Sequence, residues 1–168
     1  STFWHKTWGH CHFRHETISY DPANATIRMR EPMTQLQISI LVFDDAEELD
    51  FVGPYEVFTM ANEVARHRNR DEPFRVELLS PDGGDVTCAK GMRVGAHGAF
   101  EDLSSTDIIC IPGGRGTRKL VKDRDFAAKV ADIAPGCRWV TSVCTGAFLL
   151  AAAGLTKDRN LTTHWAAF

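Results

Sequence analysis

The sequence predicts an α/β domain with a flavodoxin-like, doubly wound and mainly parallel sheet that has helices on both faces. Two observations support this fold class. From residue 36 onwards, short apolar segments rich in β-branched residues alternate with amphipathic segments, and such alternation implies parallel strands joined by right-handed crossovers. The composition is 43% hydrophobic and 24% charged over 168 residues, which is typical of a single globular domain.

The expected strands are short and apolar. Residues 37–43 are almost wholly apolar, as in a strand that is covered on both faces. Further strands are expected at residues 74–80, 107–111 and 138–143, with a short strand or hairpin at Arg93 and Val94. In a sheet of this kind, ligands bind beyond the carboxyl ends of the strands.

The expected helices occupy the segments between these strands. An acidic loop at 44–50 precedes a helix that opens at Gly53 and Pro54 and runs to about residue 66, because proline suits the first turn of a helix. Helices are also expected at 123–133, which has one apolar face, and at 145–153. Residues 160–164 resemble the start of another strand, so we expect the domain at 36–168 to be incomplete at its C-terminal end.

The first 35 residues differ from the rest of the chain. They show no helical or strand period, so we expect residues 1–35 to be a poorly ordered extension. The segment contains His5, His10, Cys11, His12 and His15. Imidazole and thiolate are common zinc ligands, but these residues lack a recognised ligand spacing. We therefore expect no metal site.

Charge and cysteine content exclude several classes of protein. The net charge is −3, from 19 Lys and Arg against 22 Asp and Glu, which gives no basic footprint for a nucleic acid. No apolar run approaches the roughly 18 residues that a membrane helix needs. The five cysteines do not form a spaced disulfide framework, and no secretory leader is evident. We expect a cytoplasmic protein that binds neither membrane nor nucleic acid.

Cys144 is the strongest candidate for chemistry. It lies where the strand at 138–143 meets the next helix, the arrangement of a nucleophile elbow, and Gly146 and Ala147 provide the small residues that such a turn requires. Unpaired N–H groups at a helix N-terminus favour a thiolate. The alternative is a buried structural cysteine, which is our interpretation of Cys88, Cys110 and Cys137.

Other candidates carry weaker signals. Gly113 and Gly114 follow a strand and allow backbone N–H groups to approach a neighbouring site, although alone they indicate only a turn. One carboxyl of the acidic loop could shuttle protons for the cysteine. Sequence spacing cannot choose among its five acidic residues, which are Asp44, Asp45, Glu47, Glu48 and Asp50. His164 could pair with Cys144 as a base or could be structural.

Five motifs together resemble the ThiJ/PfpI superfamily, which has the class I glutamine-amidotransferase-like fold. They are LDFVGP at 49–54, IPGG at 111–114, VTSVCTG at 140–146, AAGL at 152–155 and TTHW at 162–165. The likeness covers residues 36–168. Within the superfamily, the chain is most similar to isonitrile hydratases and to the amidase-like domains of AraC-type transcription regulators.

The resemblance implies roles for individual residues. In isonitrile hydratases, a cysteine attacks the isocyanide carbon to give a thioimidate, an acidic residue relays protons, and water releases a formamide. Carried over, Cys144 is the nucleophile and Asp50 the acid/base. The N–H groups of Gly114 and Thr145 polarise the site beside Gly113, and His164 is a further site candidate.

The resemblance also leaves alternatives open. The function implied first is that of an isonitrile hydratase-type lyase without a cofactor. The second is the ligand-sensing domain of an AraC-type regulator, and the third is a thiol-based stress or carbonyl-detoxifying protein. Thr145 stands where protease-like relatives place a histidine, which counts against a protease. Superfamily members are commonly homodimers, so a small-molecule substrate or ligand and a second copy of the chain are the expected partners.

Overall fold

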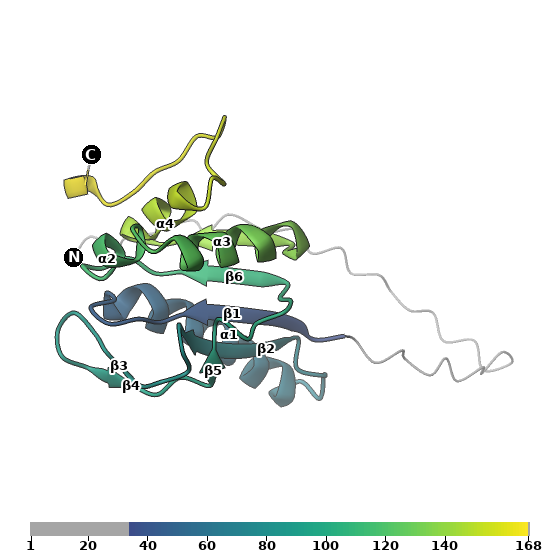
Figure 1. Ribbon diagram of the computed structural model, residues 1–168. Helices are drawn as coiled ribbons and strands as arrows, with labels where there is room; N and C mark the ends of the chain where they lie inside the picture. Colours follow the sequence, from purple (N-terminus) through teal and green to yellow (C-terminus); the bar gives the residue numbers. More distant parts are fainter. Residues whose placement is uncertain (1–33, 168) are drawn as a thin grey trace, which may run out of the picture. The chain divides into compact units, whose positions relative to one another are not determined.

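The computed structural model describes residues 34–167, which form a five-stranded parallel sheet flanked by helices (Figure 1). The strands are β1 (Leu36–Leu41), β2 (Phe74–Ser80), β5 (Gly98–Ala99), β6 (Ile108–Ile111) and β7 (Trp139–Ser142). They lie in the order β5-β2-β1-β6-β7, and every neighbouring pair is parallel. A separate antiparallel hairpin is formed by β3 (Val86–Thr87) and β4 (Arg93–Val94). This topology confirms the predicted doubly wound fold.

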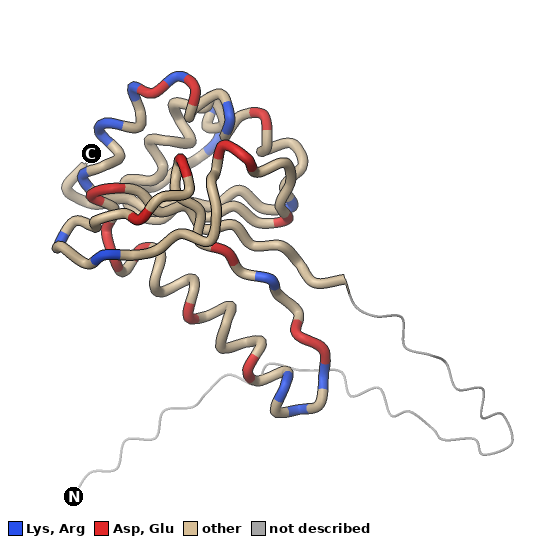
Figure 2. The backbone as a smooth tube through the Cα atoms, turned by 60° about the horizontal axis from the view of Figure 1, so that its bottom comes forward, with Lys and Arg blue, Asp and Glu red and all other residues tan. Residues whose placement is uncertain are grey.

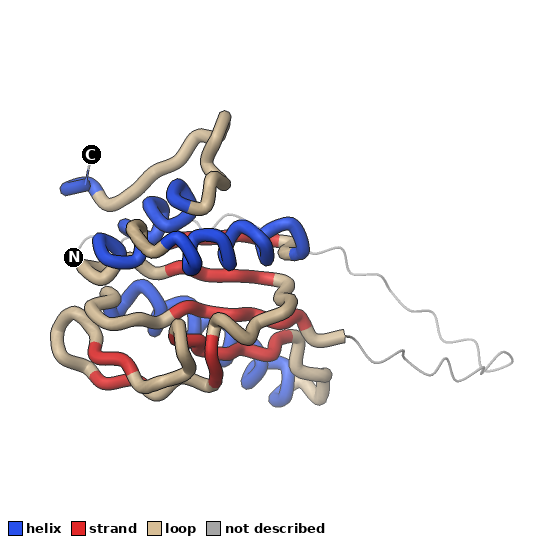
Figure 3. Tube along the Cα trace, viewed as in Figure 1, coloured by secondary structure: helices blue, strands red, loops and turns tan. Residues whose placement is uncertain are grey.

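The helices lie on both faces of the sheet. They are α1 (Glu48–His67), α2 (Thr117–Leu120), α3 (Arg124–Ile133) and α4 (Ala147–Ala152), with 3-10 turns η2 (Ala134–Gly136), η3 (Cys144–Gly146) and η4 (Trp165–Ala167). The connections β1-α1-β2 and β6-α3-β7 lead outward from the centre of the sheet in opposite directions. Right-handed crossovers therefore place α1 and α3 on opposite faces. In Figure 3, α1 passes behind the strands and α3 lies in front of β7.

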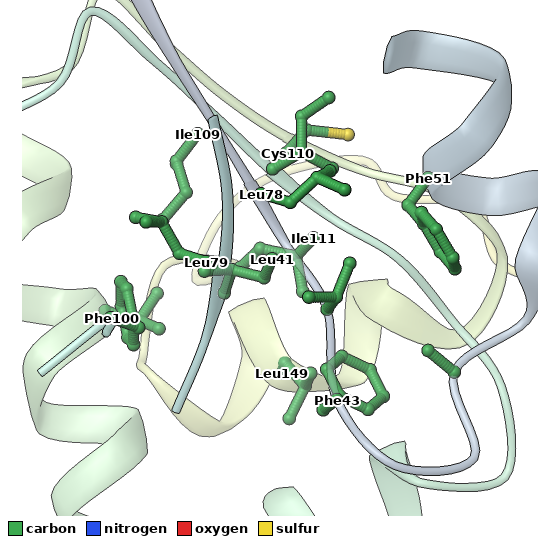
Figure 4. Close-up of a cluster of buried hydrophobic side chains, with 14 of the residues drawn as sticks. Leu41, Phe43, Phe51, Leu78, Leu79, Phe100, Ile109, Cys110, Ile111 and Leu149 are labelled. Atoms are coloured by element: carbon green, nitrogen blue, oxygen red, sulfur yellow. The ribbon is translucent and has the colours of Figure 1, made fainter. Parts of the chain in front are cut away.

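The core lies between the central strands and these helices. Ile38, Ile40, Ile109 and Ile111 on β1 and β6 are fully buried, as expected for central strands of a parallel sheet. Figure 4 shows the inner part of this cluster, where Leu149 of α4 and Phe43 lie beside the strands. Burial of these apolar side chains is the main favourable contribution to folding.

Side-chain hydrogen bonds anchor α1 to the sheet and cap the start of α3. Asn62 of α1 is 8% exposed and forms two hydrogen bonds with the backbone of Phe74, through Nδ2 to the carbonyl at 2.7 Å and through Oδ1 to the N–H at 3.1 Å. This pairing ties α1 to the first residue of β2. At α3, the carboxylate of Asp123 caps the helix by accepting from the N–H groups of Asp125 and Phe126.

The structure contradicts two predictions from the sequence and adds one strand that the sequence did not indicate. Helix α1 begins at Glu48, so the second half of the predicted acidic loop is helical and Pro54 lies inside the helix. Glu48 and Asp50 occupy its first turn, where acidic side chains favour helix formation. Residues 160–164 form no strand but a connection to η4. The short edge strand β5 was not predicted, because two residues that include a glycine give no strand period.

Some predictions lie outside the described residues. They are the N-terminal extension up to residue 33 and the histidines and cysteine within it. Within residues 34–167, no helix has both the length and the apolar character needed to cross a membrane.

Candidate active site

The candidate residues meet at one edge of the sheet. Asp50 follows β1, Gly113 and Gly114 follow β6, and Cys144 follows β7. All of these strands are parallel, so their carboxyl ends lie at the same edge. Strands β1 and β6 are neighbours whose connections leave in opposite directions, which makes the crevice between them the switch point where doubly wound folds bind ligands.

Cys144 occupies a strained turn. Its φ angle is 53°, in the left-handed region that residues with a side chain rarely adopt. A Cβ atom at Gly146 would collide with the carbonyl oxygen of Ile111, so only glycine allows the turn to pack on β6. The hydroxyl of Thr163 donates to the carbonyl of Cys144 at 3.0 Å. These constraints hold the thiol at the edge of the sheet, as in a nucleophile elbow.

Asp50 faces Cys144 from the first turn of α1. Its Oδ2 accepts a hydrogen bond from the N–H of Gly113 at 3.0 Å, and its carboxyl is near enough to the Cys144 thiol for each group to shift the pKa of the other. A Cβ at Gly113 would collide with the backbone N of Thr145 and the Cβ of Cys144. Glycine is therefore required here for the backbone of β6 to bring the carboxyl and the elbow together.

The pKa values of both groups lie above their ordinary values. Burial is the main cause for Asp50, and the nearby charge of Glu47 adds to it, whereas the N–H of Gly113 lowers the pKa. Burial also raises the pKa of the Cys144 thiol, and the Asp50 carboxylate raises it further, against the N–H of Thr145. On balance, burial and the neighbouring negative charges favour the protonated form of each group.

This finding corrects the expected thiolate at Cys144. The expectation relied on a helix N-terminus, but Cys144 begins a 3-10 turn and α4 has only six residues. Burial and the adjacent carboxylate outweigh the one N–H that faces the sulfur. The protonated form of the thiol is therefore favoured, and Asp50 is a carboxyl whose charge acts on it.

Gly114 and Thr145 are joined by a network of hydroxyl groups. The N–H of Gly114 donates to Oγ1 of Thr145 at 3.0 Å. Thr117 lies at the start of α2, and its hydroxyl donates to the carbonyl of Gly114 at 2.8 Å and lies 3.3 Å from Oγ1 of Thr145. The N–H of Gly114 is thus engaged by the Thr145 hydroxyl. No sequence signal indicates Thr117, since a threonine after a glycine turn is common.

An open cavity of about 460 Å³ adjoins the thiol. Cys144, Thr145, Gly114 and His164 are among its lining residues, whereas Asp50 and Gly113 are not. His164 lies close enough to Asp50 for its charge to lower the pKa of that carboxyl. Cys144 is therefore part of the cavity wall, whereas Asp50 is not.

Several residues around the cavity were not among the predicted site residues. The lining also includes Glu47, Lys90, Arg115, Arg118 and Phe148. Arg115 follows the glycine pair directly, which gives its approach to the site a sequence signal, whereas Arg118 lies three residues further on, in α2. Lys90 comes from the loop between β3 and β4, which no motif connects to the elbow.

The other three cysteines of residues 34–167 do not line the cavity. Cys88 and Cys110 are buried and Cys137 is half-buried, and all are free thiols, as is Cys144. Burial raises the pKa of each of these three thiols. Among the residues that the structure describes, no group of three or more His, Cys, Asp or Glu side chains is placed to hold a metal ion.

Comparison with known proteins adds to this geometry. The DJ-1/PfpI family matches residues 36–168. The chain is 37% identical over 131 residues to isonitrile hydratase from Pseudomonas putida, a match that covers 78% of this chain and 53% of that protein. It is 27% identical over 128 residues to the HTH-type transcriptional regulator GbdR from Pseudomonas aeruginosa, covering 76% of this chain and 34% of that protein.

A solved structure shares the fold. The crystal structure of a ThiJ/PfpI family protein from Pseudomonas syringae aligns with a TM-score of 0.69 at 24% identity, covering 91% of this chain and 59% of that one. The chain thus spans about half the length of that hydratase and about three fifths of this structure. These matches confirm the family resemblance and the fold expected from the motifs.

Proposed function

The chain belongs to the DJ-1/PfpI family, and on that premise we propose that it is an isonitrile hydratase-type lyase that converts small isocyanides to N-substituted formamides. The observation that carries this proposal is that Asp50 and Cys144 both approach Gly113, whose N–H donates to the Asp50 carboxylate and whose Cα has no room for a Cβ beside Cys144, at a cavity that Cys144 lines. The 37% identical relative that is named isonitrile hydratase supports the choice of reaction.

The first step forms a carbon–sulfur bond. Asp50 accepts the thiol proton, and the sulfur of Cys144 attacks the terminal carbon of R–N≡C. The proton then passes from Asp50 to that carbon, which gives a thioimidate, R–N=CH–S–Cys144. A carboxyl with a raised pKa suits both roles, because it can hold the proton and return it near neutral pH. The N–H of Thr145 stabilises the sulfur while it is negatively charged.

The second step adds water. Asp50, now a carboxylate, accepts a proton from water as the oxygen attacks the thioimidate carbon, and passes it to the imine nitrogen, which gives R–NH–CH(OH)–S–Cys144. The carbon–sulfur bond then breaks as the hydroxyl proton passes through Asp50 to the sulfur, releasing R–NH–CHO and a thiol at Cys144. The overall reaction is R–N≡C + H₂O → R–NH–CHO, so no oxidant, reductant or cofactor is required.

The proposal is tested by incubating the chain with n-butyl isocyanide and measuring N-butylformamide. We expect formamide from the wild-type chain and none above background from Cys144→Ala or Asp50→Asn. Cys137→Ala is the matched control, because Cys137 is a free thiol outside the site, and it retains activity. Absence of formamide from the wild type, or formamide from Cys144→Ala at the wild-type rate, contradicts the proposal.

A second candidate is a ligand-sensing domain. It is favoured by the match to the transcriptional regulator GbdR over 76% of this chain, since a cavity beside an unreactive thiol can bind a molecule without converting it. In that case an isocyanide or another small molecule raises the melting temperature of the chain and is recovered unchanged. The carbonyl-detoxifying alternative needs a reactive thiolate, which the raised pKa of Cys144 disfavours.

We further propose that the chain forms a homodimer through α1. Leu49, Val52, Val57, Met60 and Val64 are exposed large apolar residues of this helix. They recur at spacings of three to five residues and so form a stripe along one side of the helix. Pairing of two such stripes covers these apolar side chains on both copies.

The dimer is tested by the molar mass of the chain in solution. Val57, which is 67% exposed, is replaced in Val57→Glu, and the control is Ala128→Glu on the exposed side of α3. We expect a dimer for the wild type and for Ala128→Glu, and a monomer for Val57→Glu. A wild-type monomer at all concentrations contradicts the proposal. The free thiols of the described residues also lead us to propose a reducing, cytoplasmic compartment.

A further inference from the structure

We propose that the molecule bound at this site carries a carboxylate, and that Arg118 at the rim of the cavity recognises it. The inference deepens the proposed function, since it names the substrate class of the same site. It begins from the charge of the cavity lining, in which Lys90, Arg115 and Arg118 are cationic and Glu47 is the one carboxylate among the lining residues.

Two of the three cations are already engaged. Lys90 forms ion pairs with Glu47 and Glu48. Arg115 lies 3.4 Å from the carboxylate of Asp45 and donates to the carbonyl of Ala89 at 2.8 Å. These side chains therefore serve chiefly to hold the loops around the cavity together.

Arg118 differs from its neighbours. Among residues 34–167, no carboxylate forms an ion pair with its guanidinium. Its position is fixed all the same, because the preceding residue, Thr117, is 2% exposed and donates a hydrogen bond to the carbonyl of Gly114. The backbone of Arg118 is thus anchored to the glycine pair beside Cys144, and Arg118 lines the same cavity as Cys144.

The cationic character is local to this rim. Figure 2 shows Lys and Arg interleaved with Asp and Glu over the described part of the chain, and the net charge of the whole chain is −3. An unpaired guanidinium at the mouth of a cavity that holds a nucleophile is therefore not part of a general basic surface. A guanidinium is suited to bind a carboxylate through two parallel hydrogen bonds.

The rest of the lining limits the size and character of the ligand. Phe148, which is 40% exposed, and Ala89 and Ala167 provide apolar surface. A volume of about 460 Å³ lies at the small end of the range for ligand sites. The favoured ligand is therefore a short carboxylate whose reactive end reaches Cys144 while its anionic end contacts Arg118.

A first experiment tests anion recognition without relying on isocyanide chemistry. Cys144 is alkylated by iodoacetate, which is anionic, or by iodoacetamide, which is neutral and of similar size. In both reactions the sulfur displaces iodide from the methylene carbon. The rate at Cys144 is followed by peptide mass spectrometry, and the measured quantity is the ratio of the iodoacetate rate to the iodoacetamide rate.

We expect Arg118→Gln to lower this ratio about tenfold, because the variant loses a positive charge that concentrates the anionic reactant in the cleft. The iodoacetamide rate stays unchanged, which shows that the fold and the thiol are intact. Lys119→Gln removes the same charge from the same helix, but Lys119 does not line the cavity, and this control keeps the wild-type ratio. Equal ratios for the wild type and Arg118→Gln overturn the inference.

A second experiment connects the inference to turnover. Formamide production is compared for isocyanoacetate and n-butyl isocyanide. We expect a higher kcat/KM for isocyanoacetate in the wild type, and loss of this preference in Arg118→Gln with little change for n-butyl isocyanide. If neither isocyanide is hydrated but the alkylation ratio depends on Arg118, the proposed function fails and anion recognition stands. If both isocyanides are hydrated equally well and Arg118→Gln leaves the alkylation ratio unchanged, only the inference fails.

Discussion

The Asp50 carboxyl and the Cys144 thiol each shift the pKa of the other, although 94 residues separate them in the sequence. The carboxyl accepts the N–H of Gly113 at 3.0 Å, so it is held by the segment that follows β6. The carboxylate raises the pKa of the thiol, and the thiol partly offsets the effect of burial, which keeps the pKa of Asp50 above its ordinary value.

The first prediction concerns the pH dependence of Cys144. Asp50→Asn removes the carboxylate that raises the pKa of the thiol. Since thiolate is the reactive form, the pH midpoint for alkylation of Cys144 by iodoacetamide shifts to lower pH in the variant. Peptide mass spectrometry over a pH series measures the midpoint. An unchanged or higher midpoint would show that the carboxyl does not act on the thiol.

The second prediction concerns stability and follows from the raised pKa of Asp50. A carboxyl whose pKa is raised on folding binds its proton more tightly in the folded state. Its contribution to stability is therefore lost as the pH rises from the ordinary aspartate value through the folded value. Asp50→Asn should thus raise the melting temperature relative to wild type at pH 7, and by less at pH 4. Asp102→Asn, at an exposed site, serves as the control with no such pH dependence.

The third prediction concerns the packing of the elbow. A Cβ at Gly146 would meet the carbonyl oxygens of Ile111 and Pro112, whereas a Cβ at Gly136 would meet nothing within 4 Å. Gly146→Ala is therefore expected to lower the free energy of unfolding by about 1–3 kcal/mol through overpacking. Gly136→Ala should change it by no more than about 0.5 kcal/mol. Urea unfolding measures both, and equal effects would contradict the close approach of η3 to β6.

The fourth prediction separates a buried polar contact from an exposed ion pair on the same helix. Asn62→Ala leaves the backbone N–H and carbonyl of Phe74 without their partners, and it should cost about 1–3 kcal/mol. Glu63→Ala breaks an ion pair with Arg66 in which both side chains are about half exposed, and such pairs contribute about 0–1 kcal/mol. Urea unfolding of both variants tests the difference. A larger loss for Glu63→Ala would contradict the proposed anchoring of α1.

The order of the elements could be predicted because parallel strands leave a strong sequence signal. The segments around Ile40, Leu78 and Ile109 are apolar in runs, and their buried positions in neighbouring strands agree with that pattern. The sequence predicts too late a start for α1, because a proline such as Pro54 usually indicates the first turn of a helix. In the structure the acidic first turn begins six residues earlier, and this is the turn that presents Asp50.

The candidate site was only partly predictable. The strand–cysteine–helix pattern pointed to Cys144, whereas the family resemblance was needed to choose Asp50 from an acidic run. The raised pKa of Cys144 could not be foreseen, because it depends on burial and on a carboxylate from another element. Arg118 was also missed, since its role depends on which neighbouring carboxylates are already paired. Such properties arise from three-dimensional packing and not from local sequence.

The most direct test of the account is the covalent intermediate at Cys144. The chain is mixed with n-butyl isocyanide and quenched in acid at short times, and its peptides are analysed by mass spectrometry. The account predicts an adduct with the mass of one isocyanide on the Cys144 peptide of the wild type. It predicts none on the peptides of Cys88, Cys110 or Cys137, and none at position 144 in Cys144→Ser. Formamide production with no adduct at any time, or an adduct that forms equally fast in Asp50→Asn, would contradict the central claim that Asp50 transfers the proton that allows Cys144 to attack.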